Sequence, residues 1–315
     1  MCEPIKLKVL VTGVAGYIGS HTLATLLQAG ARVHGVDDFR AGGSSALKSY
    51  AGNNRFSFTK LDLFQNFKST YNIVKQFSPD VVLHLAATID VMKSTEDPIG
   101  CFNNNVISTQ HLVEACRREG VRRIVFASSA AVYGTTSRFP LCENAATEAL
   151  SPYAASKLCC ESILQTYAHS YGLEVVTLRY FNVYGNAGGL PISNSGVVSK
   201  FVSQALSKDK ILVRGNGEQS RDFIHISDVA SANTKAILSP QLKYDCYNVC
   251  TSKESTVNEL IKIISSYCED PLRLEYVPNS HSEVYRSIGD NRLMENDLGT
   301  HCTILLNDGI KNMMR

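Results

Sequence analysis

The sequence predicts an α/β protein in which a doubly wound parallel sheet is followed by a smaller C-terminal α/β lobe. Short, nearly continuous apolar segments alternate with helical segments over the first 180 residues, as in parallel sheets covered by helices on both faces. A glycine-rich turn joins the first apolar segment to the first helical one. After residue 182 the chain becomes richer in Gly, Pro, Ser and Asn, which marks a change of architecture.

Composition fits a folded protein of about two domains. The chain has 315 residues, 44% of them hydrophobic, and its 31 Lys and Arg nearly balance 29 Asp and Glu. The net charge of +2 gives no electrostatic reason to expect binding to nucleic acid or to a membrane surface. We therefore expect neither partner.

The ten cysteines contain no CxxC pair and no cysteine–histidine cluster with zinc-site spacing. We expect reduced thiols, no metal site and a cytoplasmic location. Residues 9–31 carry no Asp, Glu, Lys or Arg and so imitate a signal peptide or a membrane span, but four glycines and several polar side chains interrupt them. A buried strand followed by a helix explains this stretch better.

The first predicted strand is 8–13, because it is apolar and rich in valine. The helix 19–29 follows and ends before Gly30, since glycine suits a helix C-terminus. By the same reasoning the next elements are, in order, strands 32–37 and 56–61, helix 71–77, strand 80–85, helix 103–119 before Gly120, strand 123–127, helix 152–171 before Gly172, and strand 174–179.

Beyond residue 182 the predicted elements are sparser. A loop at 185–196 precedes helices 197–207, 228–238 and 256–267 and strands 210–214 and 272–277. We place the cofactor-binding domain at 1–181 and the ligand lobe at 182–315, with an interleaved boundary. The lobe is expected to cover the carboxyl ends of the strands, where ligands of such sheets bind.

Gly13, Gly16 and Gly19 lie between the first strand and the first helix. Glycines there allow a pyrophosphate to approach the backbone at the helix N-terminus, which makes the sheet Rossmann-type. Asp37 ends the second strand, where a carboxylate binds the ribose hydroxyls of adenosine and repels a 2′-phosphate. We therefore expect NAD, although Arg40 nearby leaves NADP open because an arginine can receive that phosphate.

Tyr153 and Lys157 lie four residues apart near the start of a helix, so their side chains share one face. A nearby ammonium favours the phenolate and lowers the tyrosine pKa, which suits a general acid–base. When the pair is taken alone, an ordinary amphipathic helix with a buried tyrosine and a solvated lysine explains it better. Ser129, at the end of the preceding strand, favours the functional interpretation, because its hydroxyl can bind a substrate oxygen beside the tyrosine.

Further motifs accompany these residues in a fixed order. They are the segments 11–19, 36–39, 62–63, 84–87, 94–98, 104–106, 128–134, 179–185 and 221–225. Together they resemble the extended short-chain dehydrogenase/reductase family, and within it the nucleotide-sugar 4-epimerases that act on UDP-glucose or UDP-N-acetylglucosamine. The resemblance runs nearly from end to end.

The resemblance implies roles for individual residues. Ser129, Tyr153 and Lys157 match the catalytic triad. Positions that match contacts of a tightly bound NAD are Gly13, Gly16, Tyr17, Ile18, Gly19, Asp37, Asp62, Leu63, Leu85, Ala86, Ala87, Asn105, Tyr153, Lys157 and Phe181. Positions that match the nucleotide-sugar site are Thr88, Ser129, Asn182, Val197, Arg214, Arg221 and Arg286.

The implied reaction is NAD-dependent 4-epimerisation of UDP-glucose, UDP-N-acetylglucosamine or UDP-glucuronate through a 4-keto intermediate. Dehydratases and decarboxylases of the family carry an acid after the active-site Ser or Thr, whereas this chain has Ala130 and Ala131. An NDP-sugar reductase and an epimerase acting at another carbon remain alternatives, as does a non-catalytic NAD-binding regulator. The family also implies a homodimer in which the helices near Asn103 and Pro152 form a four-helix bundle.

Three positions bear on the substrate. Ser287 falls where the family tunes pocket size, and a small residue there favours a 2-acetamido sugar. Ser280 stands where a phosphate-binding arginine is usual, so His281 or Arg286 would have to compensate. Arg214 replaces an aromatic residue that commonly stacks on the base; its planar guanidinium can also stack.

Overall fold

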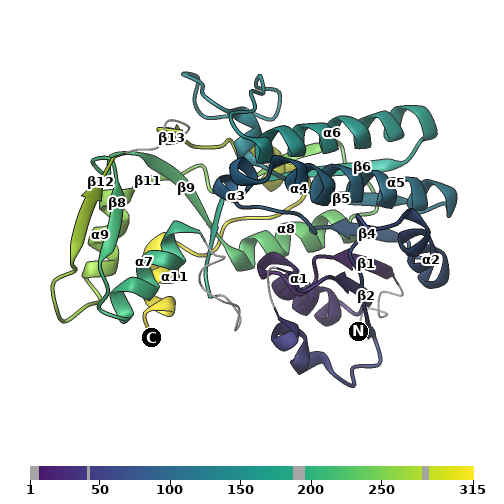
Figure 1. Ribbon diagram of the computed structural model, residues 1–315, viewed down its shortest axis with the longest axis horizontal. Coiled ribbons are helices and arrows are strands. Elements are labelled where there is room, and N and C mark those ends of the chain that lie inside the picture. Colours follow the sequence, from purple (N-terminus) through teal and green to yellow (C-terminus); the bar gives the residue numbers. More distant parts are fainter. Residues whose placement is uncertain (1–6, 41–42, 187–195, 279–283) are drawn as a thin grey trace.

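The computed structural model describes residues 7–40, 43–186, 196–278 and 284–315. The chain forms a large sheet domain, at the right of Figure 1, and a smaller lobe at its left. The predicted Ser280 and His281, and most of the predicted loop 185–196, lie outside the described residues.

A seven-stranded parallel sheet forms the centre of the large domain, with strand order β10-β6-β5-β4-β1-β2-β3. Its strands are β1 (Lys8–Thr12), β2 (Arg32–Asp37), β3 (Phe56–Lys60), β4 (Val81–His84), β5 (Arg123–Ser129), β6 (Glu174–Tyr180) and β10 (Cys246–Val249). The inner strands β1, β4 and β5 are buried along almost their whole length, which explains their continuous apolar sequences. The predicted doubly wound α/β sheet is confirmed.

Helices cover both faces of this sheet (Figure 1). Helices α1 (Tyr17–Gln28) and α8 (Ile226–Leu238) pack together on one face. Helices α2 (Phe67–Phe77), α5 (Ser108–Arg118) and α6 (Pro152–Tyr171) pack on the other. Ser151 caps α6, whose first residue is proline. Gly172 ends the helix with φ +70°, as predicted from the residue type.

The predicted helix 103–119 is in fact the last part of a longer, broken run. Helices α3 (Val91–Glu96) and α4 (Pro98–Phe102) lead into a π-helical turn, Asn103–Ile107, and then into α5. Asp97 caps α4 by accepting from the amide of Gly100 at 2.8 Å, and Pro98 follows it. The π turn lies beside the candidate site, a common location for this irregularity.

The smaller lobe has its own core and two small sheets. Strand β9 (Ser220–His225) pairs with β7 (Asn182–Tyr184), β11 (Glu254–Thr256) and β13 (Arg286–Ser287), while β8 (Ile211–Arg214) pairs with β12 (Leu274–Val277). Helices α7 (Val197–Leu206), α9 (Val257–Ser265) and α11 (Leu306–Met313) complete a separate apolar cluster.

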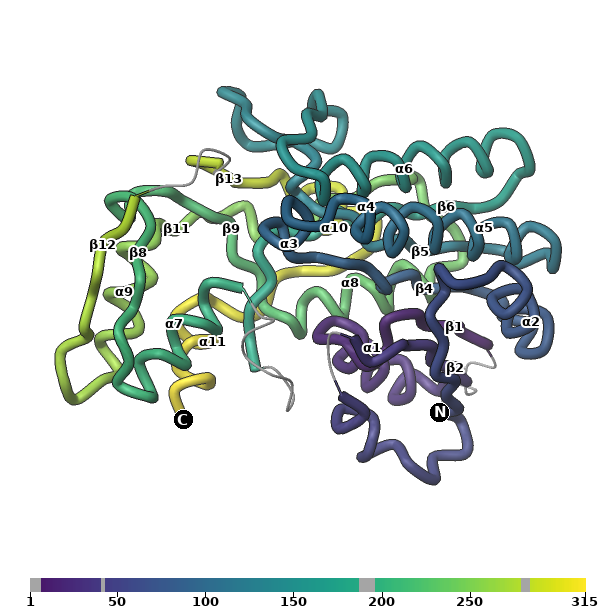
Figure 2. The backbone as a smooth tube through the Cα atoms, viewed as in Figure 1, coloured from purple at the N-terminus to yellow at the C-terminus, as the bar shows by residue number. Residues whose placement is uncertain are grey.

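The chain crosses between the two parts more than once. Strand β10 and helix α8 lie beyond residue 181, yet both belong to the large sheet domain. Helix α10 (Arg292–Asp297) packs on β10, and Figure 2 shows the yellow C-terminal segment running from α10 back to α11 in the smaller lobe. The sequence reasoning did not identify β7, β9, β10, β11, β13, α10 or α11.

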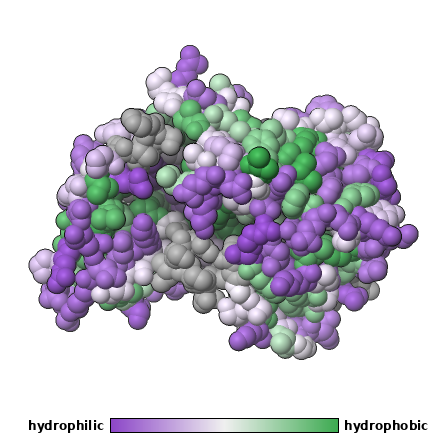
Figure 3. Space-filling view, viewed as in Figure 1, coloured by the Kyte–Doolittle hydropathy of each residue, from purple (hydrophilic) through white to green (hydrophobic). Residues whose placement is uncertain are grey.

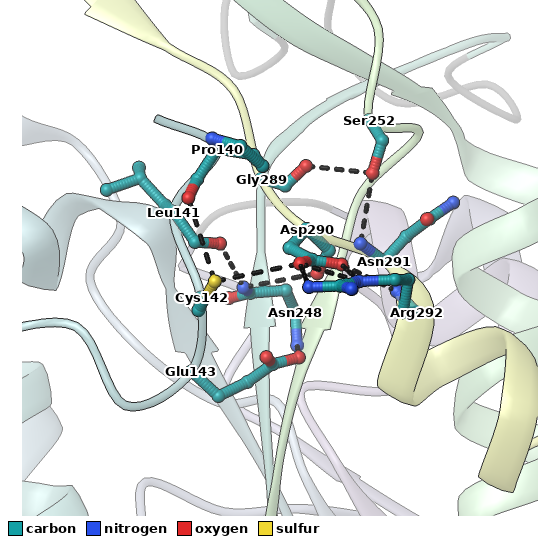
Figure 4. A network of polar contacts seen from close by, with 10 residues as sticks. All are labelled: Pro140, Leu141, Cys142, Glu143, Asn248, Ser252, Gly289, Asp290, Asn291 and Arg292. Carbon is teal, nitrogen blue, oxygen red and sulfur yellow. Dashed lines mark hydrogen bonds and ion pairs between the residues drawn. The ribbon is translucent and has the colours of Figure 1, made fainter. Parts of the chain in front are cut away.

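A polar network fastens the C-terminal segment to the loop before α6 (Figure 4). The Asn248 amide donates to the carbonyl of Leu141 at 2.8 Å, and the Asp290 amide donates to the same carbonyl, also at 2.8 Å. The carboxylate of Asp290 accepts from the Arg292 guanidinium and, at 3.6 Å, from the Cys142 thiol. This network holds the segment that follows Ser287 against the sheet domain.

Within the described residues, no helix combines the length and apolar character that crossing a bilayer requires.

Candidate functional site

A cavity of about 1170 Å³ lies at the carboxyl edge of the large sheet, where the smaller lobe meets it. Its wall comes from the ends of β1, β2, β4, β5 and β6, from α3 and α6, and from residues of the lobe. Figure 3 shows the surface hollowed between the two parts of the molecule. Carboxyl strand ends are where open α/β sheets bind their ligands.

The glycine turn forms one wall of the cavity. Gly13 has φ +70°, and a Cβ there would lie 2.8 Å from the amide nitrogen of Ala86. A Cβ on Gly19 would lie only 2.1 Å from the carbonyl oxygen of Gly13, and Gly16 begins α1 without any side-chain cap. The first backbone amides of α1 are therefore left without a side-chain cap, and a pyrophosphate can approach them closely. The residues present thus fit a dinucleotide.

Asp37, at the end of β2, places its carboxylate on the same cavity. The carboxylate is held by backbone amides, with 2.9 Å to Ala15 and 2.8 Å to Phe39. Burial raises the pKa of Asp37, and those amide hydrogen bonds counteract the rise. A fixed carboxylate at this point matches recognition of ribose hydroxyls.

Tyr153 and Lys157 also line the cavity, near Ser129 at the end of β5. The Lys157 ammonium donates to the carbonyl of Ala127 at 2.7 Å and lies 6.0 Å from the centre of the Tyr153 ring. Burial lowers the pKa of Lys157. The predicted convergence of the phenol, the ammonium and the hydroxyl on one cavity is therefore observed.

The expected lowering of the Tyr153 pKa is not observed. Burial raises this pKa to about 12, and a hydrogen bond with Ser129 opposes the rise only in part. The physical reason is that the phenol is enclosed while the Lys157 ammonium is directed to a backbone carbonyl. The protein alone thus keeps the phenol protonated, ready to donate a proton.

Two further side chains hold the start of α6 and the end of β5 in place. Neither of them was predicted as a site residue from the sequence. The Ser94 hydroxyl, on α3, accepts a hydrogen bond from the amide of Tyr153 at 3.2 Å. The Glu161 carboxylate, one turn after Lys157, binds the Arg179 guanidinium at 2.7 Å and also accepts from Ser128. Ser94 belongs to the Ser-x-x-Asp-Pro motif at 94–98, in which Asp97 and Pro98 mark the start of a helix. That motif was the signal in the sequence for this part of the site.

Two predicted site residues do not line the cavity. Asn105 is buried, with its side chain engaged by the Thr88 amide at 2.7 Å and the Ser156 hydroxyl at 2.8 Å, so it positions the chain at Thr88. Arg286 instead pairs with Glu254 at 2.6 Å and covers the ring of Phe139 at 4.6 Å. Arg286 thus lies outside the cavity and is paired within the lobe; its role in binding the diphosphate stays a prediction.

The remaining predicted residues do line the cavity. On the cofactor side these are Gly13, Gly16, Tyr17, Ile18, Gly19, Asp37, Asp62, Leu63, Leu85, Ala86, Ala87 and Phe181, and on the lobe side Thr88, Asn182, Val197, Arg214, Arg221 and Ser287. The glycine turn, the Asp37 carboxylate and the Tyr153–Lys157 pair thus line the same cavity. This arrangement can hold a dinucleotide and transfer a proton to or from a second ligand.

Comparisons with known proteins agree with this geometry. The model of the NAD dependent epimerase/dehydratase family matches residues 9–250. A putative UDP-glucose 4-epimerase from Methanocaldococcus jannaschii is 35% identical over 309 residues, 97% of each chain. A UDP-glucuronate 4-epimerase from Thermodesulfobacterium geofontis is 33% identical over 96% of this chain and 93% of its own.

Solved structures extend the similarity to three dimensions. UDP-N-acetylglucosamine 4-epimerase from Methanobrevibacter ruminantium M1, solved in complex with UDP-N-acetylmuramic acid, superposes with a TM-score of 0.88 at 31% identity, and the match covers 98% of both chains. The family model spans most of the sequence, and these relatives are covered almost end to end. The chain therefore belongs to the NAD dependent epimerase/dehydratase family.

Proposed function

We propose that the protein is an NAD-dependent 4-epimerase of a UDP-sugar. The observation that carries the proposal is the convergence of Tyr153, Lys157 and Ser129 on the cavity that also contains the glycine cradle and Asp37. The relatives named above act on UDP-glucose, UDP-glucuronate and UDP-N-acetylglucosamine by their descriptions, which supports a UDP-sugar as the substrate class.

Residues of the cradle would hold NAD tightly. The amides at the start of α1 would bind its pyrophosphate and Asp37 would bind the adenosine ribose. Lys157, which lines the same cavity beside Tyr153, would bind the second ribose. When bound, NAD supplies a hydride acceptor that later returns the hydride, so that none is consumed overall.

The chain's own residues move the proton. In this step Tyr153 would accept the proton of the sugar 4-hydroxyl while Ser129 holds that oxygen and the C4 hydride leaves to NAD. The phenol is protonated in the protein alone, so the phenolate would form only once the positively charged NAD is bound. The 4-ketone turns within the cavity, and Tyr153 then gives the proton back as the hydride returns to the other face. Ala130 and Ala131 line the same wall, and neither can protonate a leaving hydroxyl, which argues against dehydration.

The lobe side of the cavity would bind the nucleotide-sugar. Arg221 suits the diphosphate because a guanidinium grips phosphate oxygens, and Arg214 offers a planar cation to the base. Thr88, Asn182 and Val197 line the path between them. Ser287 is small and faces the cavity, which supports UDP-N-acetylglucosamine as a substrate.

Proton NMR tests the proposed reaction. The purified protein is incubated separately with UDP-glucose, UDP-N-acetylglucosamine and UDP-glucuronate, first without and then with added NAD. The matching galacto anomeric signal should grow in at least one tube. Unchanged spectra in all three tubes, with NAD present, would contradict the proposal. A further incubation of each sugar nucleotide with NADH would identify a reductase if the NADH is consumed.

We also propose the domain division at 1–181 and 182–315 with an interleaved boundary, since β10 and α8 return to the large sheet domain, together with the assembly and the location expected from the sequence. The homodimer would form through the helices α4 to α6, where Ile99 is 73% and Ile107 38% exposed and hydrophobic side chains gather over α4 and α6 (Figure 3). Light scattering of the wild type and of Ile99→Asp tests the dimer, which the variant should weaken. Free thiols at the nine described cysteines support a cytoplasmic location.

A further inference from the structure

Arg40 joins three separate segments at the adenosine end of the cavity. Its guanidinium lies 3.2 Å from the carboxylate of Asp38, just after β2, and 2.6 Å from the carboxylate of Asp62, in the loop after β3. It also donates to the side-chain oxygen of Asn104, in the π-helical turn, at 2.6 Å. All four residues line the cavity, so the guanidinium spans its wall and does not simply point into solvent.

A further hydrogen bond links Asn104 to the part of the cavity where the nucleotide-sugar is expected. The Asn104 amide donates to the hydroxyl of Thr88 at 3.1 Å, and Thr88 belongs to the chain after β4 that lines the cavity. One line of hydrogen bonds therefore runs from the β3 side of the sheet, through Arg40 and Asn104, to Thr88. A ligand in the adenosine end would be enclosed by this line on the side where the cavity meets a second, shallower hollow.

The Arg40 side chain is half-exposed, yet its guanidinium is already paired within the protein. Its donors are shared among two carboxylates and one amide oxygen, and the side chain of Asp62 is only 13% exposed. An arginine makes such fixed, forked contacts well, because its donors are planar and preorganised. The role that this arrangement fits is mechanical closure of the adenosine end, not recognition of a 2′-phosphate.

We propose that Arg40 is a clasp that retains the bound dinucleotide between turnovers. The proposal rests on the proposed function for the identity of the dinucleotide. In this proposal NAD would leave when the chain after β2 separates from the π-helical turn, and the three contacts of Arg40 oppose that separation. The clasp slows both entry and release, and it contributes nothing to the proton-transfer step itself.

Release of NAD measures the clasp directly. The protein is loaded with NAD, freed of excess, and followed by rapid gel filtration with chromatographic determination of the NAD that remains bound. Arg40→Met should release NAD about fivefold faster or more, since each half-exposed ion pair contributes modestly. Asn104→Ala should give a smaller acceleration. Lys60→Met is the matched control, because Lys60 is a neighbouring cation in the shallow hollow that does not line the main cavity.

The salt dependence of the NAD release rate is a second measurement. A variant that only lost packing contacts would keep the salt dependence of the wild type. Added salt should speed release from the wild type by screening the ion pairs, but should have little effect on Arg40→Met. Equal release rates for wild type and Arg40→Met, with NAD bound to both, would overturn the clasp and leave the proposed function standing. A wild type that binds no NAD at all would overturn the proposed function as well.

Discussion

The Ser94 hydroxyl accepts the backbone amide of Tyr153 at 3.2 Å, so the first turn of the candidate catalytic helix is fastened to the short helix α3. The same hydroxyl donates to the carbonyl of Val91 at 2.6 Å. Ser94 is fully buried, and water cannot easily replace it. The position of the phenol thus depends on a residue 59 positions earlier in the chain.

Replacing Ser94 with Ala should therefore impair both stability and turnover. The amide of Tyr153 would lose its partner in a buried place, at a cost of about 1–3 kcal/mol in the free energy of unfolding. Denaturant unfolding measures that loss, and kcat of the epimerase assay should fall more than KM rises. Ser162→Ala, at an exposed position of the same helix, should change neither; an unaltered Ser94→Ala protein would show that the contact positions nothing.

Replacing Tyr153 with Phe should abolish epimerisation while leaving NAD bound. The ring remains to fill its buried place, but no group is left to transfer the proton, and general acid–base groups typically contribute about 10²–10⁴ in rate. NMR of the sugar and chromatography of the denatured protein measure the two properties. Tyr171→Phe, in the exposed last turn of α6, is the control. Full activity of Tyr153→Phe would exclude the assigned role.

Several elements of the fold could be predicted from their own residues alone. The strand β1, the glycine turn and the end of helix α6 at Gly172 were predicted because an apolar run and glycines mark them directly. Strand β9 was missed because Arg221 and Asp222 interrupt its apolar pattern. Asp222 is nevertheless buried, since its carboxylate accepts from the amide and the hydroxyl of Thr251.

The same limit applies to the candidate site. Which residues face the cavity follows largely from motif position, as for Gly13 and Tyr153. The contacts of Asn105 and Arg40 could not be read in this way, because their partners lie far along the chain. Arg40 meets residues 22 and 64 positions away, and only the folded sheet brings those segments together.

Ser287 should control which sugars fit. It stands on β13 opposite Arg221 and faces the cavity while it is largely buried. Ser287→Tyr would fill the space that a 2-acetamido group needs, so kcat/KM for UDP-N-acetylglucosamine should fall at least about tenfold relative to UDP-glucose, roughly the effect of 1–3 kcal/mol in a pocket. Ser287→Ala keeps the side chain small and should preserve the wild-type ratio. An unchanged ratio in Ser287→Tyr would place the sugar elsewhere.

The buried His84 should make the protein sensitive to acid. Thr109 donates its hydroxyl hydrogen to the carbonyl of Asn105 at 2.6 Å, so its oxygen accepts from Nε2 of His84 at 3.0 Å. Nδ1 then accepts from the hydroxyl of Thr12 at 2.7 Å. Burial, assisted by the charge of Lys157, lowers the pKa of this neutral ring to about 3.

The sign of the pH effect follows from this shift. Below about pH 6.5 the unfolded chain binds a proton at His84 that the folded protein does not bind. The stabilising contribution is therefore complete above pH 6.5 and is lost as the pH falls towards 3, by up to about 1.4 kcal/mol per pH unit. In denaturant unfolding between pH 7 and pH 4, His84→Gln should lose less stability than the wild type, although it starts from a lower value. The exposed His169→Gln should keep the wild-type slope, and equal slopes for all three proteins would show that His84 is not the group responsible.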